Sequence, residues 1–119
     1  MPISTPEAFR GIDRLYGGTA YQTLSQRTAY VVGIGGVGSW VVEGLARSGV
    51  GEIRMADLDD LCITNTNRQV HALTSTIGQS KVEVMGARCL EINPSIAIRC
   101  DHAFVTDKTV EDLIEGDFC

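Results

Sequence analysis

The feature that constrains this chain most is the stretch VVGIGGVGSW at residues 31–40, in which four glycines fall within six residues after an apolar run. Gly33, Gly35 and Gly38 have the spacing GxGxxG. Between a strand and a helix, the first glycine allows a tight turn, the second admits a phosphate, and the third lets the helix pack on the strand. The free N–H groups at such a helix start favour an anion. The stretch therefore predicts a phosphate-binding loop.

Around this loop, strand-like and helix-like patterns alternate. Short apolar runs predict buried parallel strands at residues 29–34, 52–57 and 95–101. Helical periodicity follows each of them, at residues 39–49, 78–93 and 105–116. Two more helices are expected before the first strand, at residues 4–17 and 19–26. This order predicts an α/β fold, a Rossmann-like doubly wound parallel sheet whose three strands lie in the order 3-2-1.

The predicted sheet is incomplete, because a doubly wound sheet continues with a fourth strand beside strand 1. We expect residues 1–28 to form an N-terminal helical segment and residues 29–119 to form the first half of a nucleotide-binding domain. On this interpretation the 119 residues are inactive by themselves. The free edge of strand 1 also predicts self-association.

Composition narrows the possible partners and location. The formal net charge of −5 disfavours non-specific binding to nucleic acid, which needs phosphate neutralisation. No secretory signal pattern and no apolar run of membrane-spanning length is present, so a cytoplasmic protein without a membrane partner is expected. The four cysteines form no CxxC pair, which predicts no metal site in this chain. Cys89 falls on an apolar helix face and is expected in the core.

An acidic residue stands where a dinucleotide fold would need one. Asp57 follows Gly33 by 24 residues, at the predicted end of strand 2, where a carboxylate binds ribose hydroxyls. Asp57 and Asp59 would point to the same side if the strand continued through them. The loop and this carboxylate alone leave both NAD and ATP open as ligands.

Two cations after strand 2 favour the triphosphate. Arg68 lies in the string TNTNRQ, residues 64–69, and Lys81 lies in the first turn of the next predicted helix. The β and γ phosphates of ATP need cationic donors, with arginine as a bidentate fork and lysine as a point charge. Two solvated surface cations remain the simpler alternative. An NAD-dependent oxidoreductase and a non-catalytic binding subunit also stay open as functions.

Several motifs then agree in order and spacing with a known family. GxGGxGS, LARSGVGEI, DxD, TNTNRQ, GQSK and INP together resemble the E1-like activating enzymes, which include the ThiF, MoeB and HesA proteins. The resemblance runs from about residue 10 to the end of the chain. Within the family, RLYG and CITNTNRQVHAL are most similar to the tRNA threonylcarbamoyladenosine dehydratase branch.

The resemblance implies ATP-dependent adenylation of a carboxylate, with Mg²⁺ as the accompanying ion. In the dehydratase branch the carboxylate belongs to threonylcarbamoyladenosine on tRNA, and its activation leads to cyclising dehydration. The alternative acceptor is the C-terminus of a ubiquitin-like sulfur carrier. A homodimer is implied as well, with a cysteine desulfurase system as a possible partner.

The resemblance also assigns roles to residues. The residues that it implies as nucleotide-binding are Gly33, Gly35, Gly36, Gly38, Asp57, Asp59, Asn65, Arg68, Gln69 and Lys81. Of these, Asp57 would bind the ribose, whereas Asn65, Arg68 and Lys81 would hold the phosphates and take part in catalysis. Arg14 would act catalytically in the neighbouring subunit. The family's magnesium-binding aspartate would lie beyond Cys119. His71 could lie near the site because it follows the NRQ motif, but we expect it at the surface or as a cap, and Trp40 and Tyr30 as packing residues.

Overall fold

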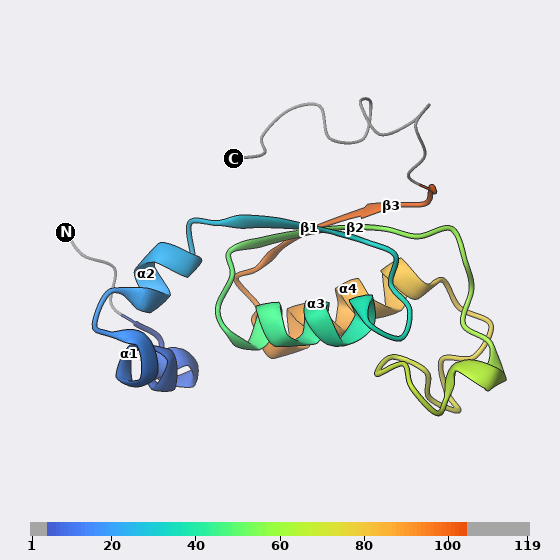
Figure 1. The fold of residues 1–119 in the computed structure, drawn as a ribbon, viewed down its shortest axis with the longest axis horizontal. Coiled ribbons are helices and arrows are strands. Elements are labelled where there is room, and N and C mark those ends of the chain that lie inside the picture. The colour runs from blue at the N-terminus through green and yellow to red at the C-terminus, as the bar shows by residue number, and fades with distance from the viewer. Residues whose placement is uncertain (1–4, 105–119) are drawn as a thin grey trace.

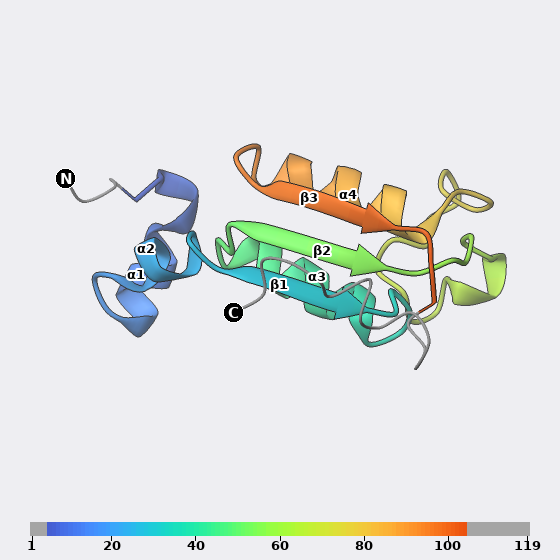
Figure 2. The ribbon, with the colours of Figure 1, turned by 90° about the horizontal axis from the view of Figure 1, so that it is seen from above.

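The computed structural model describes residues 5–104, and the statements below apply to that range. Its centre is a parallel sheet of three strands, β1 (Thr28–Val32), β2 (Glu52–Ala56) and β3 (Ala97–Asp101). The strands lie side by side in the order β1-β2-β3 (Figure 2). This arrangement confirms the predicted Rossmann-like order, read from either edge.

Two helices cover the same face of the sheet (Figure 1). Helix α3 (Gly38–Arg47) joins β1 to β2, and α4 (Lys81–Ile92) leads from the loop after β2 to β3. Successive right-handed crossovers that move in one direction across a sheet place their helices on one side. The core lies between the layers, and its fully buried side chains include Ile34, Val42, Ile53, Met55, Val82, Met85 and Cys89. The prediction that Cys89 belongs to the core is confirmed.

An ion pair joins the two helices. Glu43 of α3 accepts hydrogen bonds from Nε of Arg88 on α4 at 2.7 Å and from Nη2 at 3.1 Å. Arg47, one turn further along α3, donates to the same carboxylate at 2.9 Å. The hydrogen bond from Arg88 is the main cause that lowers the pKa of Glu43. The two helices are thus bonded to each other near the middle of each.

The opposite face of the sheet carries polar side chains. Alternation along the strands places Tyr30, Arg54 and Asp101 on this face, away from α3 and α4. Arg54 donates to Asp101 at 2.6 Å, and the hydroxyl of Tyr30 donates to the same carboxylate at 3.0 Å. The guanidinium of Arg54 also lies over the Tyr30 ring, 4.7 Å from its centroid. Tyr30 therefore belongs to a polar network, in addition to the packing role that was expected.

Residues 33–38, which follow β1 and are called the glycine turn below, lie at one end of that strand, and the N-terminal helices lie at the other end (Figure 1). They comprise the 3₁₀ turn η1 (Glu7–Phe9), α1 (Arg10–Tyr16) and α2 (Ala20–Leu24). The rings of Phe9 and Tyr21 stack at 5.4 Å and hold these segments together. Gly17 separates α1 from α2 with a φ of 114°, a conformation that favours glycine.

Most predicted element boundaries differ from the observed ones by a few residues. β1 ends at Val32, two residues earlier than expected, because Gly33 adopts a φ of 83°. α4 begins only at Lys81, because the side chain of Ser80 caps it by accepting from the N–H of Glu83 at 3.4 Å. The last expected helix, at residues 105–116, lies outside the described residues.

Candidate functional site

The glycine turn depends on glycine at two positions. Gly33 leaves the strand with positive φ while its N–H still bonds to the carbonyl of Ala56 on β2 at 2.8 Å. A Cβ on Gly38, the first residue of α3, would lie 1.8 Å from the carbonyl oxygen of Gly33. No side chain fits in that space, so the turn brings the helix start directly against the strand end. This close approach is the geometry that the GxGxxG spacing predicts.

The middle of the turn is held from two sides. Oδ2 of Asp57 accepts the N–H of Ile34 at 2.8 Å, and Nε2 of His71 lies 2.9 Å from the carbonyl oxygen of Ile34. The expectation that His71 lies at the surface or acts as a cap is wrong, because it is 1% exposed and contacts the glycine turn. Its only sequence signal is its position two residues after the TNTNRQ string.

Segment 68–71 runs along the glycine turn and the start of α3. The indole N–H of Trp40 donates to the carbonyl of Arg68 at 2.8 Å. The N–H of Val70 bonds to the hydroxyl of buried Ser39 at 3.4 Å, and His71 adds its bond to Ile34. Trp40 is 55% exposed, so the prediction that it is a packing residue is wrong. Its hydrogen bond instead connects segment 68–71 to α3.

The side chains of the same segment cover the two central glycines. A Cβ built on Gly36 would lie 3.4 Å from Cδ of Arg68, and one on Gly35 would lie 3.8 Å from Nε2 of Gln69. The guanidinium of Arg68 bonds to the carbonyl of Thr64 and to the side chain of Asn67, both at 3.1 Å. Arg68 is exposed, and its charge therefore lies over the glycine turn at the surface.

Backbone donors are available at this place. Among the described residues, the N–H groups of Gly35 and Gly36 donate no hydrogen bond, and both glycines are partly accessible. The oxygen Oε1 of Gln69 is buried and has no hydrogen-bond partner within residues 5–104. Free N–H groups at a helix start, beside a guanidinium, form a favourable environment for an anion.

The two aspartates after β2 play different parts. Asp57 is buried. Its Oδ1 accepts the N–H of Asp59 and its Oδ2 accepts the N–H of Ile34, both at 2.8 Å. Asp59 is exposed. β2 ends at Ala56, so the condition for the two carboxylates to share a side, a strand that continues through them, is not met. Asp57 anchors the glycine turn and the loop that follows it.

Asn65 and Lys81 lie in the interior of the same region. Oδ1 of Asn65 accepts the N–H of Cys62 at 2.8 Å and so caps the short 3₁₀ turn η2 (Ile63–Asn65). Lys81 is 7% exposed, and its backbone N–H bonds to the carbonyl of Asp59 at 3.1 Å. Within residues 5–104 no salt bridge includes Lys81. A cation this deeply buried without a carboxylate partner is costly unless an anion neutralises it.

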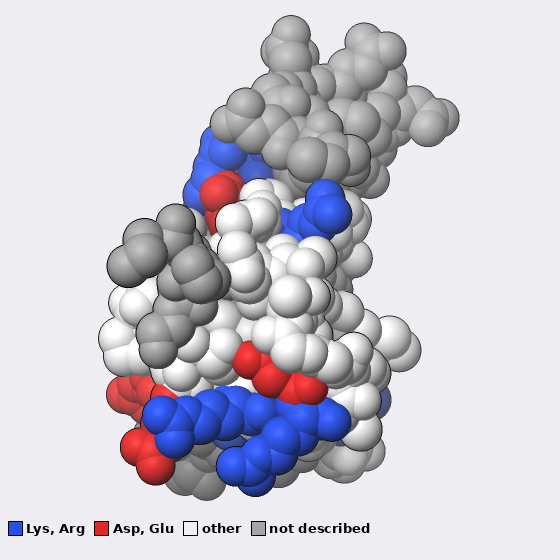
Figure 3. All heavy atoms as spheres, turned by 90° about the vertical axis from the view of Figure 1, so that its left-hand side faces the viewer, with Lys and Arg blue, Asp and Glu red and all other residues white. Residues whose placement is uncertain are grey.

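Arg14 lies at the opposite end of β1 from the glycine turn. It is exposed on α1, beyond the amino end of β1, whereas the glycine turn follows the carboxyl end of the same strand (Figure 1). Figure 3 faces that end and shows basic and acidic side chains gathered along its lower edge. The length of β1 thus separates Arg14 from the glycine turn of its own chain.

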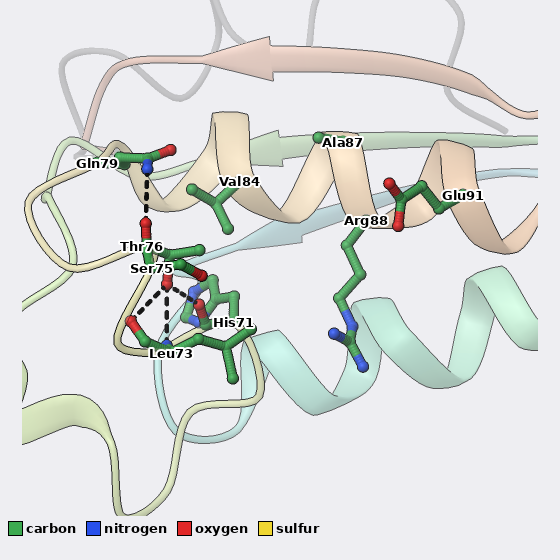
Figure 4. Close-up of a pocket in the computed structure, with 9 residues that line it drawn as sticks. All are labelled: His71, Leu73, Ser75, Thr76, Gln79, Val84, Ala87, Arg88 and Glu91. Atoms are coloured by element: carbon green, nitrogen blue, oxygen red, sulfur yellow. Dashed lines mark hydrogen bonds between the residues drawn. The ribbon is translucent and has the colours of Figure 1, made fainter.

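One cavity lies behind the site, between the loop after His71 and the outer side of α4 (Figure 4). It has a volume of about 340 Å³, and its lining includes His71, Thr76, Gln79 and Arg88. The hydroxyl of Thr76 donates to the carbonyl of His71 at 2.6 Å and accepts from the N–H of Leu73 at 2.9 Å. None of the predicted nucleotide-binding residues lines this cavity.

The remaining chemistry of the described part of the chain is limited. No three His, Cys, Asp or Glu side chains there lie together in a way that holds a metal ion. Burial raises the pKa of Cys89 to about 12, whereas the hydroxyl of Thr64 lowers the pKa of exposed Cys62. Nor does this part of the chain contain a helix whose length and hydropathy suit a membrane crossing.

Known proteins are similar to this chain in sequence and in fold. The ThiF family profile matches residues 10–118. The tRNA threonylcarbamoyladenosine dehydratase of Escherichia coli (strain K12) is 49% identical over 104 residues, which are 87% of this chain and 39% of that protein. The molybdopterin-synthase adenylyltransferase of Salmonella typhimurium is 35% identical over 80% of this chain and 38% of its own.

A solved structure agrees with both sequence and fold. The E. coli tRNA N6-threonylcarbamoyladenosine dehydratase in complex with ATP superposes with a TM-score of 0.92 at 43% identity, covering 98% of this chain and 49% of that one. The present chain spans about two fifths of the length of the curated relatives that it matches.

Proposed function

This chain belongs to the ThiF family, and we propose that it binds ATP at the glycine turn and contributes to the adenylation of a carboxylate. The observation that carries the proposal is the set of donors and cations in this part of the fold. Among the described residues, the N–H groups of Gly35 and Gly36 donate no hydrogen bond, Arg68 lies over Gly36, and buried Lys81 has no salt bridge. A polyphosphate satisfies all of these groups together.

Each group has a role in the proposed reaction. The glycine turn, Arg68 and Lys81 bind the phosphates, while Asn65 shapes the loop that presents Arg68. A carboxylate oxygen of the acceptor attacks the α-phosphorus, the acyl–adenylate bond forms, and pyrophosphate leaves with the electron pair of the broken P–O bond. Positive charge beside the departing pyrophosphate stabilises that step. Asp57 is the group that we expect to bind the ribose, and Gln69 would offer the nucleotide its amide oxygen, which has no partner among the described residues.

We propose that ATP enters as its magnesium complex. Magnesium in such sites is held by one or two carboxylates together with the substrate phosphates. Its protein ligand is expected outside residues 5–104, and no step of the proposal is routed through the ion. Arg14 is proposed to serve the site of a second subunit, because the length of β1 separates it from its own glycine turn.

For the acceptor we propose threonylcarbamoyladenosine on tRNA. The 49% identity to an E. coli tRNA threonylcarbamoyladenosine dehydratase favours it over a carrier protein, since the adenylyltransferase relative is 35% identical. Once adenylated, the carboxyl carbon is attacked from within the modified nucleoside, a ring closes and AMP leaves. The C-terminus of a ubiquitin-like sulfur carrier is the second candidate acceptor.

Calorimetric titration with ATP and, separately, with NAD tests the nucleotide. We expect saturable ATP binding that weakens about 10- to 100-fold in Arg68→Ala and Lys81→Ala, the loss of one charged hydrogen bond each. Arg99→Ala removes an exposed cation on β3 and should leave the affinity unchanged. NAD binding that is indifferent to Arg68 and Lys81 would contradict the proposal.

The acceptor needs a second assay. In the complete protein, ATP–pyrophosphate exchange should depend on tRNA that carries threonylcarbamoyladenosine, and unmodified tRNA is the control. Exchange that requires a ubiquitin-like carrier instead would select the other acceptor. Exchange with neither acceptor, despite ATP binding, would indicate a binding subunit without catalytic activity.

A further inference from the structure

We propose that His71 is a positioning residue, which aims the backbone N–H of Gly35 at the phosphates of the bound nucleotide. This inference rests on the proposed function for the identity of the ligand. Its geometric part rests on the described contacts alone.

The first step concerns the two hydrogen bonds to the backbone of Ile34. The ring nitrogen Nε2 of His71 lies 2.9 Å from the carbonyl oxygen of Ile34, and Oδ2 of Asp57 accepts the N–H of the same residue at 2.8 Å. The side chain of Ile34 is fully buried in the core. The peptide groups on both sides of Ile34 are therefore fixed in orientation, one by each partner.

The second step follows from peptide geometry. The carbonyl of Ile34 and the N–H of Gly35 belong to one planar trans peptide unit, so they point in opposite directions. Because the carbonyl points toward buried His71, the N–H of Gly35 points away from it. Among the described residues that N–H has no acceptor, and Gly35 is partly accessible. A free donor facing outward at a helix start is directed at an anion.

The third step concerns the state of the ring. A carbonyl oxygen only accepts, so Nε2 must carry the hydrogen, and Nδ1 is then the unprotonated nitrogen. Nδ1 is buried and has no hydrogen-bond partner in the part of the chain that the structure describes. Burial is the main cause that lowers the pKa of His71; the bond to Ile34 and the charge of Asp57 oppose this effect, while Lys81 and Arg88 add to it. The ring is thus a neutral donor held in one tautomer.

The contacts of segment 68–71 explain how His71 keeps this position. The bonds from Val70 to Ser39 and from Trp40 to Arg68 hold the segment to α3 on the side that precedes His71. On the other side, Thr76 bonds to the carbonyl of His71 at 2.6 Å. The backbone that carries the ring is therefore fixed from both directions.

The binding test compares two substitutions and three ligands. His71→Leu removes the donor, whereas His71→Gln keeps an N–H donor on a side chain of similar reach. We expect His71→Leu to weaken ATP and inorganic tripolyphosphate about tenfold, the effect of one misdirected hydrogen bond, and to leave adenosine unchanged. His71→Gln should recover most of the loss. His102→Leu, at the exposed second histidine, is the matched control.

A spectroscopic readout tests the geometry without any ligand. In the ligand-free chain, nitrogen NMR of the His71 ring should show a protonated Nε2 whose hydrogen exchanges slowly. The amide resonance of Gly35 should shift in His71→Leu and return toward its original position in His71→Gln. A ring protonated at Nδ1 alone would overturn the inference, since the bond to Ile34 would then not exist.

The outcomes separate this inference from the proposed function. Tripolyphosphate binding that depends on His71, in a chain that does not bind ATP, would support the positioning role and contradict the nucleotide. Equal ATP affinity in the original chain and in His71→Leu would overturn the positioning role alone. An equal loss for ATP, tripolyphosphate and adenosine would also overturn it, because that result indicates a general structural defect. Binding of neither phosphate ligand would overturn both.

Discussion

The indole N–H of Trp40 donates to the backbone carbonyl of Arg68 at 2.8 Å, so a hydrogen bond joins the start of α3 to segment 68–71. Trp40 is the only tryptophan, which makes its emission a direct report on that contact. We predict that ATP binding changes the emission of Trp40. Trp40→Phe should weaken ATP about three- to tenfold, as expected for one neutral hydrogen bond. Val41→Ala, at a neighbouring exposed residue, should bind ATP normally.

Lys81 allows a binding role to be separated from a structural one. It is 7% exposed and, within residues 5–104, has no salt bridge. Lys81→Met removes a buried charge while keeping an extended side chain, so thermal stability should stay the same or rise. ATP affinity should nevertheless fall about 10- to 100-fold. Joint loss of stability and affinity in calorimetry would mean that the lysine is structural.

Two glycines of α3 should respond oppositely to the same substitution. At Gly38 a Cβ would lie 1.8 Å from the carbonyl oxygen of Gly33, whereas at Gly44 nothing lies within 4 Å. Gly44→Ala is expected to stabilise the fold by about 0.5–1 kcal/mol, the usual helix-interior gain. Gly38→Ala should be strongly destabilising and abolish ATP binding. Denaturant unfolding measures both, and equal effects would contradict the described turn.

The buried state of His71 predicts how stability depends on pH. Burial lowers its pKa below the ordinary value of 6.5, so between the lowered value and 6.5 the unfolded chain binds a proton that the folded chain does not. Stability from this residue is therefore complete above pH 6.5 and decreases as the pH falls through that window. Urea unfolding at several pH values should show this slope. It should be absent in His71→Gln and retained in His102→Gln.

The position of Arg14 predicts complementation between subunits. If Arg14 serves a neighbouring site, Arg14→Ala and Lys81→Met should each inactivate the complete protein, but for different reasons. Mixed dimers would contain one intact site, formed by Lys81 of one subunit and Arg14 of the other. Random mixing should restore about a quarter of the original activity, because half of the dimers are mixed and each has one working site. If subunit exchange is confirmed but activity does not recover, Arg14 does not act in the neighbouring subunit.

The parts of the fold that were predictable are those with a local cause. Gly33 and Gly38 define the turn, and the strands were predictable because apolar residues such as Val31, Ile53 and Ile98 recur on the face that α3 and α4 cover. The family resemblance was predictable as well, and the profile match over residues 10–118 confirms it. Lys81 was correctly placed in the first turn of α4, although the helix was expected to begin at residue 78 and Ser80 caps it instead.

The misplaced residues depend on contacts between segments far apart in the sequence. His71 contacts Ile34, 37 residues away, and Trp40 contacts Arg68, 28 residues away. Neither pairing leaves a periodic pattern, so a histidine after a polar string resembles a surface residue. The roles of Asn65, Gln69 and Asp59 at a nucleotide remain predictions, because the described contacts reveal their protein partners only.

The ion pair between Glu43 and Arg88 has an effect beyond the two helices that it joins. Gly38 and Lys81 are the first residues of those helices, and both are proposed to face the same phosphates. A bond between the helix bodies therefore sets how far apart the two starting residues stand. Arg88 is partly buried and is not one of the proposed nucleotide-binding residues. We therefore expect a substitution of Arg88 to change ATP affinity indirectly, through the distance between the two helix starts.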